Sequence, residues 1–352
     1  MRTYLVGGAV RDELLGRECK DRDYVVVGAN TQQMLAAGFT QIGKDFPVFL
    51  HPQTHEEYAL ARVERKTGAG HGGFAVSTEN VTLEEDLGRR DLTINSMALA
   101  ADGTLVDPYG GLADLQGHTL RHTTAAFEED PLRVLRIARF LARFGPDWGV
   151  HPQTTEMVLR MVRGGALNEL PFERIWKELE RGLMEPHPAL MVTAMLAWEV
   201  PQQAQCMAGI TGVRPGYQLA LGLAAEQGAV LAVRFAAAFT VEARKTPSAL
   251  PREVTELAVS VQAAEEHGAR GYSQLDAAQR LGILERLDVI RRPQRLELVL
   301  QAMQLIEPFD DQRLRNEAAT LAAMDRGAIA AACGQGVDIR QRIQAASLAA
   351  IA

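Results

Sequence analysis

Hydrophobic and polar positions follow different patterns in the two parts of the chain. Up to about residue 120, short apolar runs alternate with glycine-rich turns and short helical patterns, which is typical of a domain built from strands and helices. The runs that predict strands are Thr3–Val6, Tyr24–Val27, Val48–Leu50, Tyr58–Ala61 and Leu105–Asp107. From about Asp130 onward, apolar residues recur at helical spacing in long segments rich in Ala, Leu, Arg and Gln. The pattern predicts an α+β chain, in which a head with a sheet is followed by an all-helical extension.

Composition narrows the class of protein. The 352 residues are 47% hydrophobic and 23% charged, which is typical of a soluble globular protein. No apolar run approaches the ~18 to 20 residues that a membrane helix needs, and the N-terminal segment does not have the pattern of a signal peptide. Three widely spaced cysteines, Cys19, Cys206 and Cys333, predict neither a disulfide framework nor a metal cluster. We therefore expect a cytoplasmic protein.

The net charge of -7 and the pI near 5.7 argue mildly against a nucleic-acid-binding protein. Phosphate binding depends on a local basic face rather than on the total charge, so such a protein is not excluded. Arginines are concentrated in two stretches of the extension, Arg291–Arg295 and Arg313–Arg315. These stretches could contact phosphates, although charge runs are more often solvated faces.

The first candidate for phosphate binding is the double glycine Gly7-Gly8. It follows an apolar run and precedes a helical pattern, so backbone amides at the helix start would be open to an anion. Arg11, in the first helical turn, could add a charge-assisted hydrogen bond to the same anion. An ordinary tight turn with a solvated arginine explains this short pattern equally well.

Two aspartates at the start of the next apolar run are the candidate metal ligands. Asp21 and Asp23 are two residues apart, so on a strand they point to the same face, ~7 Å apart along the chain. Two carboxylates in this arrangement repel each other unless a cation lies between them. Mg²⁺ prefers one or two carboxylates together with phosphate oxygens of a substrate. The alternative is that both aspartates flank the strand in solvent.

Arginines within an apolar helix form the third candidate site. Asp130-Pro131 is a favourable helix start, with Asp as the N-cap residue and Pro at the first helical position. The helix then carries Arg133, Arg136 and Arg139 among apolar residues on nearly every side, and buried arginines need anionic or hydrogen-bonding partners. The partner would be a bound anionic or hydrogen-bonding ligand or, alternatively, the acidic residues nearby in the chain.

Taken together, these motifs resemble those of the bacterial-type (class II) tRNA nucleotidyltransferases, the CCA-adding enzymes of the tRNA nucleotidyltransferase–poly(A) polymerase branch of the DNA polymerase β-like superfamily. Gly7-Gly8 with Arg11-Asp12 and Asp21-x-Asp23 resembles the first motif of this branch. Four further segments resemble its later motifs in the same order, closely up to about residue 180: Arg89–Ala98, Asp107–Leu115, Glu129–Arg133 and Leu170–Leu179.

The resemblance implies two-metal transfer of a nucleotide onto the tRNA 3′ end. Asp21 and Asp23 would hold Mg²⁺, Glu57 is the candidate for a third carboxylate by its position, and Arg90 would contact the sugar or the triphosphate. Gly8 and Arg11 would belong to the nucleotide site.

For base selection, the resemblance assigns Asp130 and Arg133, with Arg136 and Arg139 binding triphosphate or bracing the pair. Cytosine and adenine both present an amino donor beside a ring-nitrogen acceptor, which a carboxylate and a guanidinium can match. Uracil and guanine present the reverse order. An aspartate that also caps its own helix has one oxygen already engaged, so we expect Asp130 to perform only one of these two roles well.

The resemblance also implies an architecture and a set of substrates. We expect a polymerase-β-like head with a small mixed sheet (residues 1–122), a helical neck (123–190), a helical body (191–270) and a helical tail (271–352). The body and tail would grip the acceptor and T arms of tRNA, while CTP and ATP are the substrates. The oligomeric state stays open.

Two segments bear on which activities are present. Residues 62–74 contain the glycine-rich stretch of a mobile loop, which in the family serves the switch from CTP to ATP, so we expect addition of full CCA. Thr240 and Val241 stand where some bacterial relatives have the His-Asp pair of a phosphohydrolase domain, so we expect no phosphohydrolase activity. The alternatives are a poly(A) polymerase, a CC-only enzyme, or an inactive tRNA-binding protein.

Overall fold

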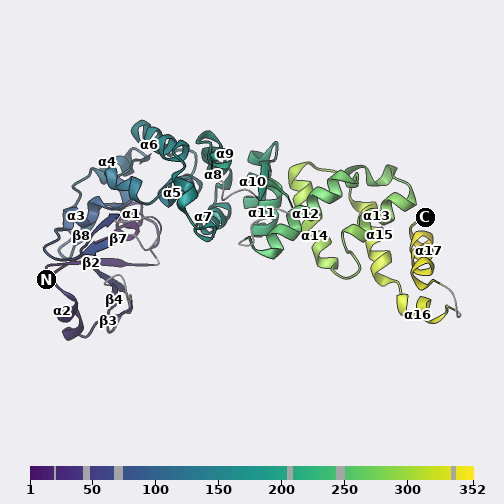
Figure 1. Ribbon diagram of the computed structural model, residues 1–352, viewed down its shortest axis with the longest axis horizontal. Helices are drawn as coiled ribbons and strands as arrows, with labels where there is room; N and C mark the ends of the chain where they lie inside the picture. Colours follow the sequence, from purple (N-terminus) through teal and green to yellow (C-terminus); the bar gives the residue numbers. More distant parts are fainter. Residues whose placement is uncertain (20, 43–47, 67–73, 204–208, 243–249, 334–337) are drawn as a thin grey trace. The chain divides into compact units, whose positions relative to one another are not determined.

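The computed structural model describes residues 1–19, 21–42, 48–66, 74–203, 209–242, 250–333 and 338–352 (Figure 1). The chain divides into two compact units. Unit 1 comprises Met1–Glu178 with Ala194–Ala204, and unit 2 comprises Leu179–Thr193 with Gln205–Ala352. The finer boundaries expected after residues 122, 190 and 270 stay a prediction.

A seven-stranded mixed sheet lies at the centre of the N-terminal part of unit 1. Its strands lie in the order β3 (Thr40–Gln41), β4 (Val48–Leu50), β5 (Glu57–Leu60), β2 (Asp23–Val27), β1 (Arg2–Val6), β8 (Ala98–Ala100) and β9 (Leu105–Val106). The pair β2–β5 is parallel, and the other neighbouring pairs of this sheet are antiparallel. The chain returns from β2 to β5 through α2 (Thr31–Ala36) and the strands β3 and β4, so β2 and β5 begin at the same edge.

Both faces of this sheet are covered, which explains why β2 reads as an uninterrupted apolar run. Val25 and Val27 belong to a core cluster that includes Leu87 of α3 (Leu83–Gly88). Val26 points to the opposite face, into a cluster with Met34 of α2. By this alternation Asp23 lies on the face of Val25 and α3.

The five strands expected from the sequence are found within one residue of their expected bounds. Two short strands of the sheet, β3 and β8, were not expected, because Thr40–Gln41 and Ala98–Ala100 lack a strong strand pattern. The hairpin β6 (Val63–Lys66) and β7 (Phe74–Ser77) forms a separate two-stranded sheet.

The expected helical extension is found, with two short strand pairs beside its helices. At the end of the head, β10 (Thr119–Leu120) pairs with β11 (Gly149–Val150), and further along the chain β12 (Ile210–Val213) pairs with β13 (Phe239–Val241). These strands have only two to four residues, which is too short for a period-2 pattern to stand out in the sequence. The rest of the described extension is mainly helical.

Helices complete unit 1 around α5, the arginine-bearing helix. The elements of this part are α1 (Gly8–Leu14), α4 (Gly111–Gln116), α5 (Leu132–Phe144), α6 (Pro152–Arg163), α9 (Val200–Gln203) and the first part of α7 (Phe172–Met184), with the short 3-10 helices Thr93–Asn95, Ala125–Glu129 and Ala166–Glu169. Helix α5 is buried on most sides, as expected, and stacks Phe144 on Trp148. The helix α8 (Pro188–Ala197) belongs partly to each unit.

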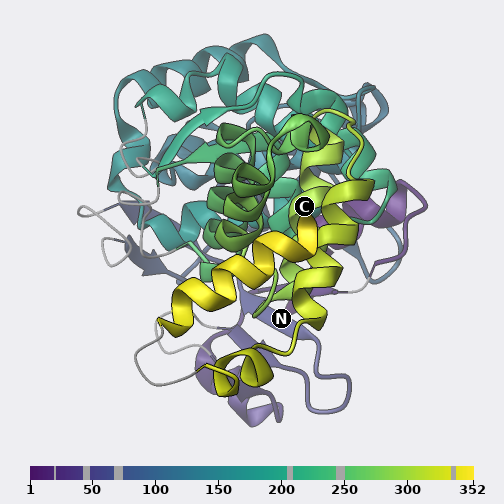
Figure 2. The same ribbon diagram turned by 90° about the vertical axis from the view of Figure 1, so that its right-hand side faces the viewer.

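Unit 2 is built mainly from helices. They are α10 (Tyr217–Glu226), α11 (Leu231–Ala238), α12 (Arg252–Glu266), α13 (Ala277–Arg286), α14 (Pro293–Ile306), α15 (Gln312–Ala323), α16 (Arg326–Ala331) and α17 (Ile339–Ile351), with a 3-10 helix at Ala269–Gln274. Helix α11 packs against α10, α12 and α14, and the C-terminal helix α17 against α13, α15 and α16 (Figure 2). Among the described residues, we find no helix whose length and apolar character would let it cross a membrane.

Candidate active site

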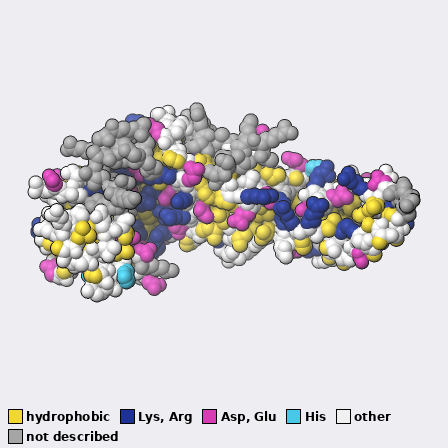
Figure 3. All heavy atoms as spheres, turned by 60° about the horizontal axis from the view of Figure 1, so that its bottom comes forward, with side chains coloured by type: hydrophobic (Ala, Val, Ile, Leu, Met, Phe, Trp, Pro, Cys, Tyr) yellow, Lys and Arg dark blue, Asp and Glu magenta, His cyan; other side chains and the backbone are white. Residues whose placement is uncertain are grey.

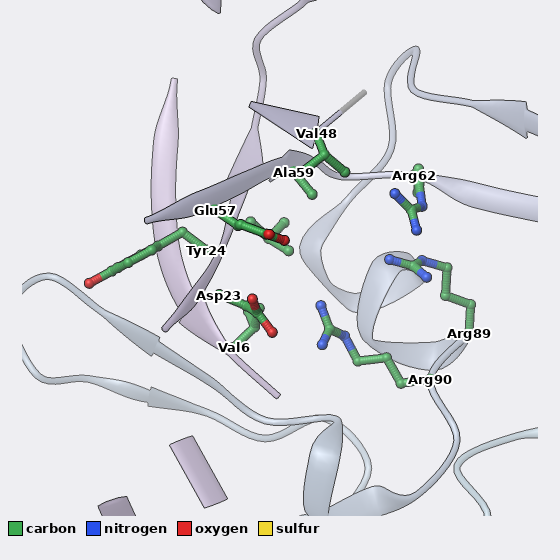
Figure 4. Close-up of a pocket in the computed structure, with 10 residues that line it drawn as sticks. Val6, Asp23, Tyr24, Val48, Glu57, Ala59, Arg62, Arg89 and Arg90 are labelled. Carbon is green, nitrogen blue, oxygen red and sulfur yellow. The ribbon is translucent and has the colours of Figure 1, made fainter. Parts of the chain in front are cut away.

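A pocket of about 280 Å³ opens where the two parallel strands β2 and β5 begin (Figure 4). Asp23 is the first residue of β2, Glu57 is the first residue of β5, and the two are register partners. Their carboxylates lie on one side of the pocket, and three guanidinium groups lie on the other. The lining residues are Val6, Asp23, Tyr24, Val25, Val48, Glu57, Ala59, Arg62, Arg89 and Arg90.

The carboxylates of Asp23 and Glu57 are held together by the sheet rather than by a hydrogen bond. Partial burial, then Glu57, and more weakly Asp21 raise the pKa of Asp23, while Arg90 opposes the rise. Like charges that the backbone forces together favour a bound cation. Asp21 is exposed, precedes β2, and acts on Asp23 by its charge although it does not line the pocket.

The carboxylates of the pocket match the ligand preference of Mg²⁺. Among the residues that the structure describes, no group of three or more His, Cys, Asp or Glu side chains is arranged to hold a metal ion. Mg²⁺ in nucleotide-handling sites takes one or two carboxylates, with water and phosphate oxygens completing its six ligands. The neighbouring carboxylates of Asp23 and Glu57 fit that requirement.

The arginines of the pocket are anchored by Asp86, a fully buried carboxylate of α3. One oxygen accepts hydrogen bonds from Nε and Nη2 of Arg89 at 3.1 and 2.9 Å, and the other accepts from Nη2 of Arg90 at 3.1 Å. Asp86 also accepts the backbone N–H of Arg62 at 3.2 Å. Although burial alone would raise it, the charges of Arg90 and Arg89 lower the pKa of Asp86. An ionised Asp86 thus fixes the direction of two guanidinium groups.

Arg90 keeps unused capacity for an anion. Its Nε atom is buried and has no hydrogen-bond partner among the described residues. Gly7 passes so close that a Cβ there would lie 2.8 Å from Nη1 of Arg90. The backbone of Gly7 has φ 71° and ψ -133°, a conformation that favours glycine. The double-glycine turn is therefore needed where it packs on Arg90, next to the pocket.

Gly8 and Arg11 lie away from the lining of this pocket. Gly8 opens α1, and the buried Arg11 donates to Asp12 from Nε at 2.9 Å and to Asn95 Oδ1 from Nη1 at 2.6 Å. Its guanidinium also lies over the ring of Phe140 in α5, at 5.3 Å from the centroid. Burial lowers the pKa of Arg11, while Asp12 opposes the shift. In the structure Arg11 ties α1 to α5, and its phosphate contact stays a prediction.

The candidate base-reading residues lie where the neck meets the pocket arginines. Asp130 comes just before α5, and its Oδ1 accepts the backbone N–H of Leu132 at 3.2 Å, as a capping carboxylate does. The helix begins one residue later than expected, at Leu132, so Pro131 occupies the N-cap position. Arg133 donates from Nη1 to the backbone oxygen of Ala126 at 2.7 Å and from Nη2 to that of Arg89 at 2.6 Å.

Arg136 and Arg139 have internal acidic partners, as the alternative explanation of the arginine helix expects. Nε of Arg136 donates to Asp91 Oδ2 at 2.9 Å, and Nε of Arg139 donates to Glu178 Oε2 at 2.7 Å. Asp91 and Glu178 are both buried. This arrangement favours bracing of the neck by Arg136 and Arg139, and their contact with triphosphate stays a prediction.

Several residues at the site were not singled out from the sequence. Arg62 and Arg89 line the pocket, Asp86 anchors its arginines, and Arg174 of α7 binds Asp130. For Arg89, the doubled arginine of its motif was a usable signal. Asp86 lies in an acidic helical turn that reads as a solvated face, and only the fold shows that its side chain is buried.

Two other expectations fall elsewhere in the chain. Residues 67–73, the centre of the expected mobile loop, lie outside the described residues. Thr240 and Val241 lie on β13, where the Thr240 hydroxyl accepts a hydrogen bond from Thr211 at 3.0 Å.

The arginines expected to meet tRNA phosphates have acidic neighbours in unit 2. Arg292 and Arg295 pair with Glu256, Arg313 pairs with Glu317, and Arg315 pairs with Glu297 and Asp311. Figure 3 shows basic and acidic side chains interspersed over a face of this unit. The contacts of these arginines with RNA stay a prediction.

Comparisons with known proteins agree with the motifs. Residues 3–121 match the poly A polymerase head domain. The "Multifunctional CCA protein" of Azoarcus sp. (strain BH72) is 46% identical over an alignment of 401 positions, which covers 100% of this chain and 97% of that protein. The CCA-adding enzyme of Bacillus stearothermophilus in complex with CTP has a TM-score of 0.67 and 22% identity, covering 99% of this chain and 88% of its own. The Thermotoga maritima CCA-adding enzyme complexed with tRNA has a TM-score of 0.65 and 20% identity, covering 99% and 86%. The two structures support the fold, and the full-length relative shows that this chain is a nucleotidyltransferase that belongs to the family of CCA-adding tRNA nucleotidyltransferases.

Proposed function

We propose that this enzyme adds and repairs the 3′-terminal CCA of tRNA, using CTP and ATP and releasing pyrophosphate, in the cytoplasm. The observation that carries the proposal is the pocket at the start of β2 and β5, where Asp23 and Glu57 face Arg62, Arg89 and Arg90. Nucleotidyl transfer requires carboxylates that bind a metal ion and, opposite them, cationic side chains that bind a triphosphate.

The carboxylates divide the catalytic work with the arginines. Asp23 and Glu57, with Asp21 beside them, would hold Mg²⁺ ions. When bound, these ions would lower the pKa of the tRNA 3′-hydroxyl and neutralise the negative charge of the departing pyrophosphate. Arg90, which lines the pocket, would donate to the triphosphate from its guanidinium group, in a direction fixed by Asp86 and by the backbone of Gly7.

Base selection would take place at the start of α5. Asp130 would accept the amino hydrogen of cytosine or adenine, and Arg133 would donate to the adjacent ring nitrogen. The hydrogen bond from Arg133 to the backbone oxygen of Arg89 supports this assignment, because it joins the base-reading residue to the pocket wall. Full CCA addition is favoured over CC addition by the presence of the loop sequence at residues 62–74.

The discriminating experiment extends a tRNA transcript that lacks CCA. The enzyme is incubated with Mg²⁺ and CTP, ATP or both, and products are resolved at single-nucleotide length, with Asp23→Ala as the inactive control. We expect two additions with CTP and a third when ATP is also present. A stop after two would indicate a CC-adding enzyme, a long ladder with ATP would indicate a poly(A) polymerase, and no product would indicate a tRNA-binding protein without this activity.

The enzyme is further expected to lack phosphohydrolase activity, because Thr240 and Val241 replace the His-Asp pair. The Thr240 hydroxyl bonded to Thr211 and the buried Val241 are not metal ligands of the expected kind. Hydrolysis of a phosphomonoester by the purified protein in the presence of divalent metals would contradict this expectation.

A further inference from the structure

Helix α7 presents two charged side chains, one helical turn apart, to the charged residues at and beyond the start of α5. Arg174 binds Asp130, and Glu178 binds Arg139 at 2.7 Å. Residues four apart lie on the same helix face, so both contacts come from one side of α7. Because Glu178 is 4% exposed and its neighbour Ile175 is 2% exposed, this side of α7 is firmly packed within unit 1.

The contact between Arg174 and Asp130 is bidentate. Nη1 of Arg174 donates to Oδ1 at 3.2 Å, and Nη2 donates to Oδ2 at 3.1 Å. Two parallel hydrogen bonds from a planar fork fix the plane of the carboxylate as well as its position. Without Arg174, the carboxylate of Asp130 would keep one hydrogen bond to the described residues, from the backbone N–H of Leu132 to Oδ1, and a single bond allows rotation.

Counting acceptor sites shows what this arrangement does to Asp130. An ionised carboxylate has about four lone-pair sites. Arg174 uses two of them and the N–H of Leu132 uses a third. About one site is left, and its direction is set by the others. Both oxygens accept from Arg174, so neither is free to carry a hydrogen toward the carbonyl oxygen of uracil or guanine.

We propose that Arg174 is a positioning residue for base selection, which leaves Asp130 a single aimed acceptor for the amino group of cytosine or adenine. The inference rests on the proposed function of Asp130. It makes α7 a part of the specificity apparatus, although Arg174 itself does not touch the base. Substitution of Arg174 should therefore change the ratio of kcat/KM between nucleotides more than it lowers kcat/KM for all of them.

The test compares incorporation of CTP and UTP into a tRNA transcript that lacks CCA. The full-length enzyme is assayed as Arg174→Gln and Arg174→Lys, and the discrimination is the ratio of kcat/KM for CTP to that for UTP. We expect the ratio to fall about tenfold in Arg174→Gln, because the carboxylate of Asp130 could then rotate and would no longer present a fixed acceptor against the carbonyl oxygen of uracil. Arg174→Lys keeps the charge but loses the planar fork, so it should fall between Arg174→Gln and the wild type.

Lys177→Gln is the matched control, because Lys177 is exposed on the same helix and the substitution removes the same charge. Its ratio should equal that of the wild type. Equal losses of kcat/KM for CTP and UTP in Arg174→Gln would show a purely structural role and overturn the proposal, as would an unchanged enzyme. Should Arg174→Gln fail to fold, judged by its tryptophan fluorescence, Arg174→Lys carries the same test.

Asp130→Ala separates this proposal from the proposed function. A fall of the ratio in Asp130→Ala but not in Arg174→Gln would overturn the role of Arg174 alone. An unchanged ratio in Asp130→Ala would refute base selection by Asp130, and the role of Arg174 with it. In the double variant Arg174→Gln/Asp130→Ala, we expect no further fall beyond that of Asp130→Ala, since Arg174 acts through that carboxylate.

Discussion

Replacing Asp91 with asparagine should destabilise unit 1, because Asp91 is a buried carboxylate that joins the head to α5. Its Oδ2 accepts from Nε of Arg136 at 2.9 Å, and its Oδ1 accepts from the backbone of Leu92 and from Asn95 Nδ2, both at 2.9 Å. An asparagine can keep the acceptor bonds on one side. Its amide hydrogens would then face the guanidinium of Arg136, donor against donor.

The expected loss follows from the pKa of this carboxyl. Burial alone would raise it, but the Arg136 guanidinium and the hydrogen bonds from Asn95 and Arg136 outweigh burial and lower the pKa of Asp91 to about 2. Compared with the ordinary value of 3.8, that shift corresponds to about 2 kcal/mol of stability at neutral pH. Arg136 would keep the buried Glu178 at 3.9 Å but lose its closer partner Asp91, which brings the expected loss in Asp91→Asn to about 3 kcal/mol.

The measurement is urea unfolding followed by tryptophan fluorescence. Trp148, Trp176 and Trp198 all belong to unit 1 and are buried, so their emission reports on that unit alone. The exposed Asp147, in the turn after α5, supplies the control Asp147→Asn, which should leave the free energy of unfolding within about 0.5 kcal/mol of the wild type.

The pH dependence gives a second criterion. A lowered pKa in the folded state stabilises the protein above about pH 4, and this contribution is lost as the pH falls through the folded value of about 2. The difference between wild type and Asp91→Asn should therefore be about 1 kcal/mol smaller at pH 3 than at pH 7. A difference that is equal at the two pH values, or a loss at pH 7 no larger than that of Asp147→Asn, would refute the reasoning.

Two further predictions concern the pocket. Asp23→Asn should abolish nucleotide addition and yet raise the unfolding temperature of the metal-free protein by about 2 °C. The gain is expected because partial burial and Glu57 raise the pKa of Asp23 and so oppose its charge. Thermal unfolding in EDTA measures this gain, which should shrink as the pH falls and the wild-type carboxyl is protonated. Gly7→Ala should lower kcat/KM for CTP at least about tenfold by pushing Arg90 aside. The control Gly16→Ala, with φ +65° and no atom within 4 Å of the added Cβ, should leave kcat/KM near the wild-type value. Comparable losses in both variants would contradict the role of Gly7.

Much of the head could be predicted from the sequence because its signals are local. Runs of β-branched residues bounded by glycine and polar turns gave the long strands β1 and β2. The pairing of these strands is not local. That β2 lies beside β5 in parallel, with Asp23 opposite Glu57, depends on a crossover through α2, β3 and β4, which no periodicity in the sequence reports. The placement of Glu57 beside Asp23 came from the family resemblance, and the register agrees with it.

The partners of the arginines were the least predictable part of the site. The sequence of α5 indicates that Arg136 and Arg139 are buried and need anions, but an anion from a nucleotide and one from the protein satisfy that need equally. The carboxylates that bind them, Asp91 and Glu178, lie 45 and 39 residues away along the chain. Pairings over such separations follow from the packing of the head, α5 and α7, and no spacing rule in the sequence supplies them.

Under the proposed function, the three consecutive residues Arg89, Arg90 and Asp91 would link base recognition to phosphate chemistry. Arg90 lies in the pocket, the backbone oxygen of Arg89 accepts from Arg133, and Asp91 accepts from Arg136. Arg133 and Arg136 are both on α5, so this helix is attached on either side of Arg90. In that case a base that fits badly at the start of α5 would strain these same contacts, and reacting groups misplaced by ~1 Å cost a large factor in rate. Discrimination between nucleotides is therefore expected mainly in kcat/KM, through the alignment of Arg90 with the triphosphate, and less in the binding of the nucleotide itself.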